Sequence, residues 1–91
     1  MITKEITLQN RSGLHAKPAS TFVRAACRFH SDISITKDAV KANAKSIMGV
    51  IILAVQQGDT VILEADGDDE QEAIDSLSDL INSKFGIEAE A

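Results

Sequence analysis

Apolar residues recur along this chain at two different spacings, and that pattern limits its fold more than any other feature. Residues 2–8, 33–36 and 61–65 alternate between apolar and polar, as half-buried strands do, and a turn after residue 36 leads into a short strand near 40–43. Residues 16–28 and 69–84 repeat apolar residues every three or four positions, which predicts two helices. In a chain of 91 residues, strands with one apolar face favour an antiparallel sheet with helices on one side over a parallel, doubly wound sheet. No linker or repeat divides the sequence, so we expect one α+β domain over residues 1–91.

Three further segments give more local predictions. Residues 46–55 are almost continuously apolar, and periodicity alone does not distinguish a buried strand from a short helix there. The acidic run 66–70 lacks the ligand spacing of a calcium loop and is expected to form a turn and the first turn of a helix. Gly86 is expected to end the last helix, and residues 87–91 to form a frayed tail.

The segment Gly13–Ala19 places a histidine where the first helix is expected to begin. The apolar face formed by Ala19, Phe22, Val23 and Ala26 requires a start just before residue 19, and Pro18 suits a first helical turn. The amides of Ala16 and Lys17 then lack intrahelical acceptors and form an anion site at the positive end of the helix dipole. His15 would lie at the mouth of that site.

A histidine in that position has two interpretations. Neutral imidazole is a nucleophile near pH 7 and could carry a phosphoryl group held by helix-end amides and by the cations Lys17, Arg11 or Arg24. The alternative is a solvated histidine that acts as an ordinary N-terminal cap of the helix, which is the commoner situation for an isolated histidine. A hydrolase would need a second base or a metal cluster, and neither His30 nor Cys27 has recognisable partners for one.

Two motifs resemble one known family. Residues 12–19 (Ser-Gly-Leu-His-Ala-Lys-Pro-Ala) resemble the active-site segment of HPr, the histidine-containing phosphocarrier family of the bacterial phosphotransferase system, and residues 43–50 (Asn-Ala-Lys-Ser-Ile-Met-Gly-Val) resemble its regulatory serine motif. The resemblance implies an open-faced β-sandwich, in which a four-stranded antiparallel sheet is covered on one face by three helices in the order βαββαβα. It also implies that His15 accepts the phosphoryl group, through Nδ1 in the family, and that Ser12, Ala16 and Lys17 stabilise it.

One position departs from the family pattern. The family usually has arginine two residues after the active histidine, and this chain has Lys17. Lysine supplies a charge without the planar fork of a guanidinium, so it orients phosphoryl oxygens less strictly. We therefore expect Lys17→Arg to raise the transfer rate or the lifetime of the phosphohistidine.

The resemblance also implies that residues 46–55 begin a helix near Ser46. Ser46 would cap that helix and would be the target of an HPr kinase/phosphorylase. A short helix that is apolar on all sides cannot bury every side chain, so some of Ile47, Met48 and Ile51 are expected to remain exposed, while Val50 and Leu53 join the core. With Arg24, the exposed residues would form the surface that docks enzyme I as donor and enzyme IIA domains as acceptors.

Charge and cysteine content restrict the class of protein. Residues 1–45 hold eight basic and three acidic residues, a net charge of +5, whereas the remainder has a net charge of −10. The overall charge of −5 argues against a nucleic-acid binder, and a basic region around His15 could steer acidic partners. Three lysines are expected only to solvate outer faces: Lys4, Lys37 and Lys84. The single Cys27 is expected to be a small buried hydrophobe on the first helix, and His30 is explained by the dipole at the end of that helix.

These observations predict a cytoplasmic, monomeric phosphocarrier rather than an autonomous enzyme. The sequence has no apolar run of membrane-spanning length and no signal region, and neither a metal site nor a cofactor is expected. Two alternatives stay open. One is a regulatory homologue that binds a catabolite-control transcription factor or a metabolic enzyme when Ser46 is phosphorylated, and the other is a phosphocarrier of the nitrogen branch.

Overall fold

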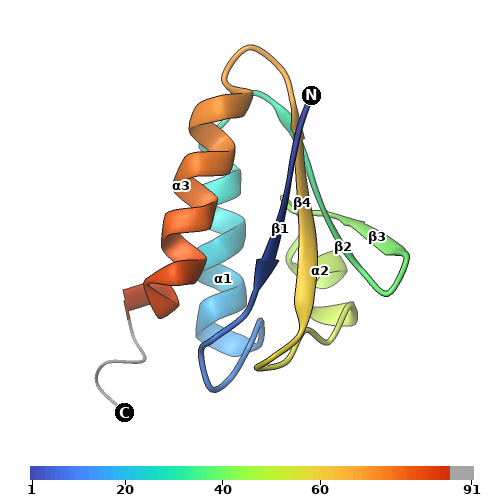
Figure 1. Ribbon diagram of the computed structural model, residues 1–91, viewed down its shortest axis with the longest axis vertical. Helices are drawn as coiled ribbons and strands as arrows, with labels where there is room; N and C mark the ends of the chain where they lie inside the picture. Colours follow the sequence, from blue (N-terminus) through green and yellow to red (C-terminus); the bar gives the residue numbers. More distant parts are fainter. Residues whose placement is uncertain (87–91) are drawn as a thin grey trace.

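The computed structural model describes residues 1–86 as one antiparallel sheet with three α-helices (Figure 1). The elements follow the order β1 (Ile2–Thr7), α1 (Ala16–Ala26), β2 (Asp32–Lys37), β3 (Val40–Asn43), α2 (Ile47–Ile52), β4 (Thr60–Asp66), α3 (Glu70–Asn82) and a 3₁₀ turn η1 (Lys84–Gly86). The expected open-faced α+β sandwich with the order βαββαβα is confirmed.

The strands lie in the spatial order β1-β4-β2-β3, and every neighbouring pair is antiparallel. Central strand β4 therefore pairs with β1 on one side, where Ile6 lies opposite Val61, and with β2 on the other, where Ile35 lies opposite Leu63. In Figure 1, α1 runs up and α3 runs down beside each other, and α2 lies near the lower end of the sheet. β1 and β2, which α1 connects, are not neighbours in the sheet, so each can pair antiparallel with β4 between them.

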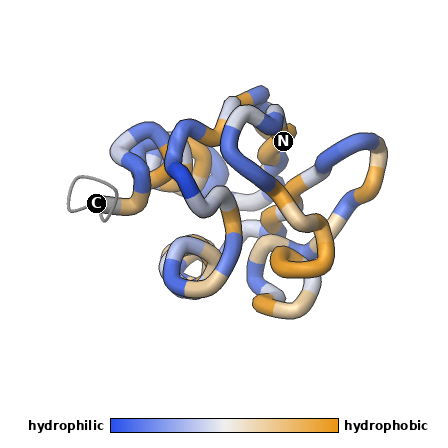
Figure 2. The backbone as a smooth tube through the Cα atoms, turned by 90° about the horizontal axis from the view of Figure 1, so that it is seen from below, coloured by the Kyte–Doolittle hydropathy of each residue, from blue (hydrophilic) through white to orange (hydrophobic). Residues whose placement is uncertain are grey.

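Strand alternation and helical spacing fill one core between the sheet and the helices. On β4 the buried positions are Val61, Leu63 and Ala65, whereas Ile62 points to the open face and is 41% exposed. The predicted α1 face of Ala19, Phe22, Val23 and Ala26 is buried. Along the tube in Figure 2, hydrophilic and hydrophobic stretches accordingly follow one another at short intervals.

The C-terminal end of α3 differs from the prediction. The helix ends at Asn82, followed by the cap residue Ser83, and the chain then turns through Lys84 and Phe85, both with positive φ. Phe85 is only 4% exposed, so its burial against the core explains why the backbone leaves the helix before Gly86. The frayed tail expected at 87–91 lies outside the described residues.

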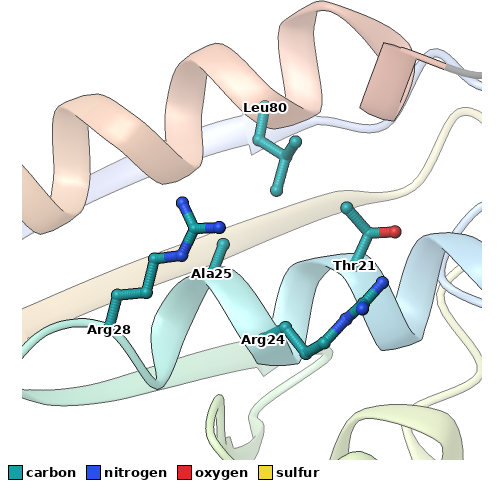
Figure 3. A pocket seen from close by; sticks show the side chains of 5 residues that line it. All are labelled: Thr21, Arg24, Ala25, Arg28 and Leu80. Carbon is teal, nitrogen blue, oxygen red and sulfur yellow. The ribbon is translucent and has the colours of Figure 1, made fainter.

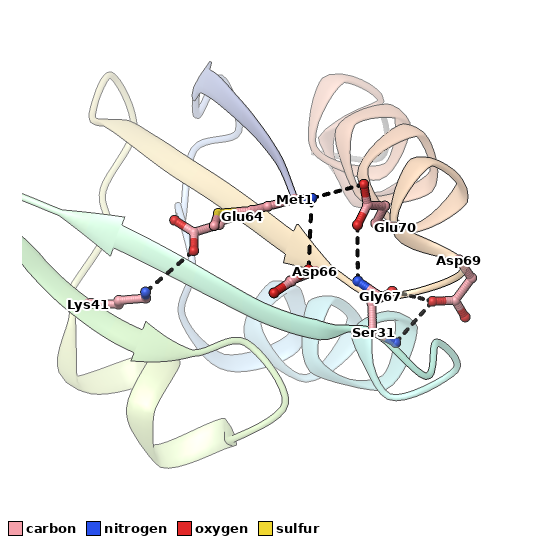
Figure 4. A network of polar contacts seen from close by, with 8 residues as sticks. All are labelled: Met1, Ser31, Lys41, Glu64, Asp66, Gly67, Asp69 and Glu70. Atoms are coloured by element: carbon pink, nitrogen blue, oxygen red, sulfur yellow. Dashed lines mark hydrogen bonds and ion pairs between the residues drawn. The ribbon is translucent and has the colours of Figure 1, made fainter.

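The acidic run after β4 joins two loops at the end of the molecule that is uppermost in Figure 1. Asp69 precedes α3, as the sequence predicts, but its carboxylate accepts a hydrogen bond from the His30 amide at 2.8 Å. It also accepts hydrogen bonds from the Ser31 amide (2.9 Å) and the Ser31 hydroxyl (Figure 4). These donors lower the pKa of Asp69 to about 2, with the Ser31 hydroxyl the largest cause. Glu70 accepts from the Gly67 amide at 3.0 Å and from the Met1 ammonium at 3.1 Å.

Two predictions about the end of α1 were wrong. Cys27 is exposed, because α1 ends at Ala26 and the next position turns about 100° away from the buried face. His30 lies beyond the cap residue Cys27, outside the last helical turn on which a helix dipole acts. The backbone amide of His30 donates a hydrogen bond to the Asp69 carboxylate.

Candidate functional site

His15 is the N-cap residue of α1 and leaves its side chain free. Its backbone is extended (φ −123°, ψ 157°), its ring makes no capping hydrogen bond, and the residue is exposed. The helix begins at Ala16 and Pro18 is buried in the first turn, so the predicted helix start is confirmed. The imidazole is thus open to a partner protein, which a nucleophile that receives a group from another macromolecule requires.

The first turn of α1 has the geometry that the predicted anion site beside His15 requires. The first amides of a helix have no intrahelical acceptor, and the capping position offers no side-chain oxygen to them here. Lys17 and Ser12 are both exposed and lie within three residues of His15 in the sequence. Ala16 has φ +48°, which is rare for a residue with a Cβ, so the backbone turns sharply between the histidine and the helix. This arrangement can hold a dianionic group on the ring with amides and one nearby cation.

The segment that follows α2 holds the loop that carries His15 in place. The Leu14 amide donates to the Val55 carbonyl at 2.9 Å, and the Leu14 side chain is fully buried. Gly13 has φ +58°, and a Cβ at this position would collide with the Val55 carbonyl oxygen. Glycine is therefore needed at position 13 for two reasons, its backbone conformation and the close approach of the neighbouring chain.

A second set of hydrogen bonds joins the same two segments, through residues 8–9 on one side and 57–59 on the other. The Leu8 amide donates to the Asp59 carbonyl at 2.9 Å, and the Gly58 amide donates to the Leu8 carbonyl at 2.8 Å. The Gln57 side chain donates to the Gln9 carbonyl at 3.0 Å. The turn after α2 and the loop before His15 consequently form one hydrogen-bonded unit.

Lys37 anchors the end of α2 to this unit, so the prediction that it only solvates an outer face was wrong. Its ammonium donates to the carbonyls of Ala54 (2.9 Å) and Leu53 (3.4 Å) and pairs with Asp59 at 3.1 Å. The lysine side chain is 19% exposed. A cation at these carbonyls complements the negative end of the short helix. The Gln56 amide and then Lys37 hold the pKa of Asp59 below its usual value.

Ser46 is the N-cap of α2, as expected. Its hydroxyl accepts a hydrogen bond from the Gly49 amide at 3.2 Å, and α2 follows over Ile47–Ile52. The apolar run therefore forms a helix, which the periodicity alone left undecided. The hydroxyl is only partly buried, so the capping role does not close it off from solvent.

α2 exposes a continuous apolar surface, which we call the α2 patch and define as Ile47, Met48, Ile51 and Ile52. Their exposed fractions are 39%, 62%, 37% and 71%, whereas Val50 is fully buried and Leu53 is 7% exposed. The predicted division between exposed and core residues is confirmed. Ile52, the most exposed of the four, is not among the residues that the sequence predicted to be exposed. Its position four residues after Met48 puts it beside Met48 on the outer face of the helix.

Arg24 lies on the outer side of α1 at a shallow groove against α3. The groove has a volume of about 280 Å³ and is lined by Thr21, Arg24, Ala25, Arg28 and Leu80 (Figure 3). Within residues 1–86, neither the Arg24 nor the Arg28 side chain makes a hydrogen bond or an ion pair, so both guanidinium groups are available to an external anion. Since α1 also packs against α2, Arg24 belongs to the same helix layer as the α2 patch.

The remaining expectations concern metals and membranes. Among residues 1–86 the structure contains no group of three or more side chains placed to ligate a metal ion. None of the helices in that range has the length and apolar character needed to cross a bilayer.

Comparison with known proteins points to one family. The family model described as "PTS HPr component phosphorylation site" matches residues 2–83. The chain is 43% identical over 86 residues to the phosphocarrier protein HPr of Neisseria meningitidis, covering 94% of this chain and 97% of that protein. It is 48% identical over 77 residues to the HPr-like protein Crh of Halalkalibacterium halodurans, covering 85% of this chain and 92% of that protein.

Solved structures agree with this similarity. The crystal structure of HPr from Thermoanaerobacter tengcongensis matches with a TM-score of 0.93 and 55% identity, covering 94% of this chain and 97% of the other. A dimer of HPr from the same organism matches with a TM-score of 0.77 and 57% identity, covering 89% and 93%. The similarity therefore extends over the whole fold and includes the segment around His15.

Proposed function

This chain belongs to the HPr family of phosphocarrier proteins, and from that membership we propose that His15 accepts a phosphoryl group from enzyme I and passes it to enzyme IIA domains. The observation that supports this proposal most is that the His15 imidazole, at the start of α1, is exposed and makes no capping hydrogen bond. Sugar uptake is then the process served, and phosphoenolpyruvate is the original donor.

The chemical step needs little from this chain beyond position and charge. A ring nitrogen of His15 forms a bond to phosphorus while the bond between phosphorus and the donor breaks, and the donor keeps that electron pair. The same step in reverse order delivers the group to the acceptor. The free amides of Ala16 and Lys17, the Lys17 ammonium and Ser12 stabilise the oxygens that carry the charge. Because no second base is required, the protein acts as a carrier.

Partner docking is assigned to the α2 patch and Arg24. Exposed apolar side chains on a small protein are typical of interaction sites, and the flexible thioether of Met48 adapts to different partner surfaces. The unpaired guanidinium of Arg24 adds attraction for acidic partner surfaces. One surface can thereby serve donor and acceptors in turn.

Regulation is assigned to Ser46, as the substrate of an HPr kinase/phosphorylase. A phosphate at this cap would lie at the helix start and add about −1.5 to −2 charges, which the fold should tolerate. The charge would fall beside Ile47 and Met48, so it would repel an acidic enzyme I surface and could recruit a partner with a basic cleft, such as a catabolite-control transcription factor.

The experiment is incubation of the full chain with phosphoenolpyruvate and enzyme I, followed by intact-mass analysis under mildly alkaline conditions. We expect one phosphoryl addition that is labile in acid and absent from His15→Ala. Ser46→Ala serves as the matched control and should still gain the group. A phosphoryl group retained by His15→Ala would contradict the assignment of the site.

A second candidate function is a regulatory role of the kind suggested by the similarity to Crh. In that role the Ser46-phosphorylated protein would act by binding another protein, with little phosphoryl transfer through His15. The free imidazole favours the carrier, because a purely regulatory protein has no need of it.

A further inference from the structure

The loop that precedes His15 begins with a buried polar side chain. Asn10 is 1% exposed and is one of three buried polar residues in the part of the chain that the structure describes, the others being Ser31 and Ser78. Asparagine is seldom fully buried unless its amide is hydrogen-bonded.

Only half of the Asn10 amide is satisfied. Its Nδ2 donates to the Gly13 carbonyl at 2.7 Å, and the Gly13 amide donates back to the Asn10 carbonyl at 3.2 Å, so two bonds close the turn over residues 10–13. Its Oδ1 is buried and has no hydrogen-bond partner. A buried acceptor without a partner costs free energy, which an apolar side chain of similar size would avoid. What Asn10 provides that such a residue would not is the donor to Gly13.

That donor acts on the residue whose conformation decides where His15 lies. Gly13 has φ +58° and lies directly against Val55, and Leu14 donates to the Val55 carbonyl. His15 follows immediately, and its exposed ring has no capping bond of its own. The ring position therefore depends on the backbone of residues 10–14, and a small displacement there moves the attacking nitrogen.

We propose that Asn10 is a positioning residue for phosphoryl transfer: its side-chain amide holds the Gly13 turn so that His15 meets the donor in a reactive geometry. This rests on the proposed function of His15. Asn10 acts through the backbone and does not contact the transferred group. An apolar residue at position 10 would remove the unpaired Oδ1, but it would also leave the Gly13 carbonyl without this hydrogen-bond donor.

The test is single-turnover phosphorylation of the full chain by phosphorylated enzyme I, over a range of enzyme I concentrations. Asn10→Leu removes the donor and the unpaired acceptor together, and Asn10→Asp keeps the shape but removes the donor. We expect both to lower the maximal transfer rate about five-fold, the equivalent of one hydrogen bond, with the half-saturating enzyme I concentration unchanged. Hydrogen exchange at the Leu14 amide should quicken in both.

Ser78→Ala is the matched control, because it removes another buried, unpartnered oxygen that belongs to a different element, α3. It should leave the transfer rate unchanged. A purely structural role for Asn10 would lower the melting temperature without changing the maximal rate, and that result would overturn the inference, as would wild-type rates in both variants. If Asn10→Leu does not fold, Asn10→Asp decides alone. Absence of phosphorylation in the unaltered protein would instead overturn the proposed function.

Discussion

At the scale of single residues, the proposed chemistry depends on three neighbours at the start of α1. In that proposal His15 supplies the nitrogen, Ala16 supplies an amide from a strained backbone position, and Lys17 supplies the charge. All three could be located from the sequence, because Pro18 and the apolar face of α1 define where the helix must begin. That the His15 ring makes no capping hydrogen bond could not be predicted from the sequence, because this depends on the orientation of the side chain.

Lys17→Arg should improve the site. A guanidinium can donate two parallel bonds to phosphoryl oxygens, whereas the ammonium of the exposed Lys17 acts as a point charge. We expect the transfer rate from enzyme I or the lifetime of the phosphohistidine to rise a few-fold, about 1 kcal/mol of added stabilisation. Rapid-quench kinetics and the decay of the phosphoprotein measure the two quantities. Identical values for lysine and arginine would show that the fork is dispensable here.

Ser46→Asp should separate regulation from stability. A carboxylate can accept the Gly49 amide bond in place of the hydroxyl, so the melting temperature should stay nearly unchanged. Phosphorylation by enzyme I should slow several-fold, because the new charge lies beside the α2 patch. Ser46→Ala is the control: it loses the cap at a cost of about 1 kcal/mol, or about 4–8 °C in melting temperature, without slowing transfer. Equal rates in all three proteins would rule out the electrostatic account of regulation.

At the scale of elements, the sequence predicted the long helices and the strands, and it failed where tertiary contacts decide. The apolar periodicity predicts a helix over residues 16–28 with Cys27 buried on it, whereas α1 ends at Ala26 and Cys27 is exposed. Local sequence predicts a solvent-exposed Lys37, because its partners, the carbonyls at the end of α2, lie 16 and 17 residues away. The end of α3 depends on the burial of Phe85, which no local signal announces.

The Lys37 anchor should matter for stability. Lys37→Met keeps the stem but removes the donor to Ala54 and Leu53, so we expect a loss of about 1 kcal/mol in the free energy of unfolding and faster hydrogen exchange at the end of α2. Urea titration and exchange by NMR measure these changes. Lys41→Met is the control, because Lys41 is 60% exposed and its 3.5 Å pair with Glu64 should contribute little. A loss of equal size in both variants would contradict the anchoring role.

At the scale of the whole molecule, the two ends of the sheet have different tasks. The end with the His15 loop and α2 exposes the apolar α2 patch, and the other end is joined by acidic side chains that bind backbone amides (Figures 1 and 4). We expect the isolated chain to be a monomer, although a dimer of a similar HPr exists, and light scattering on the purified protein measures this.

Asp69 should make the stability depend on acid. Its pKa is lowered from 3.8 to about 2 in the folded chain, so the ionised form stabilises the fold above about pH 4, and this contribution is lost as the pH falls toward 2. Asp69→Asn should therefore lower stability at neutral pH and flatten the decline between pH 4 and 2 in urea titrations. Asp68→Asn, an exposed neighbour, should decline like the unaltered protein. An unchanged slope in Asp69→Asn would contradict the assigned hydrogen bonds.

The most direct test of the account is delivery of the phosphoryl group. The His15-phosphorylated chain would be freed of enzyme I, mixed with an unphosphorylated enzyme IIA domain, and followed by intact mass for both proteins at mildly alkaline pH. The account predicts that the acceptor gains one phosphoryl group as this chain loses one, and that the exchange fails with His15→Ala carried through the same procedure. A phosphohistidine that forms but never leaves for any enzyme IIA domain would contradict the carrier role.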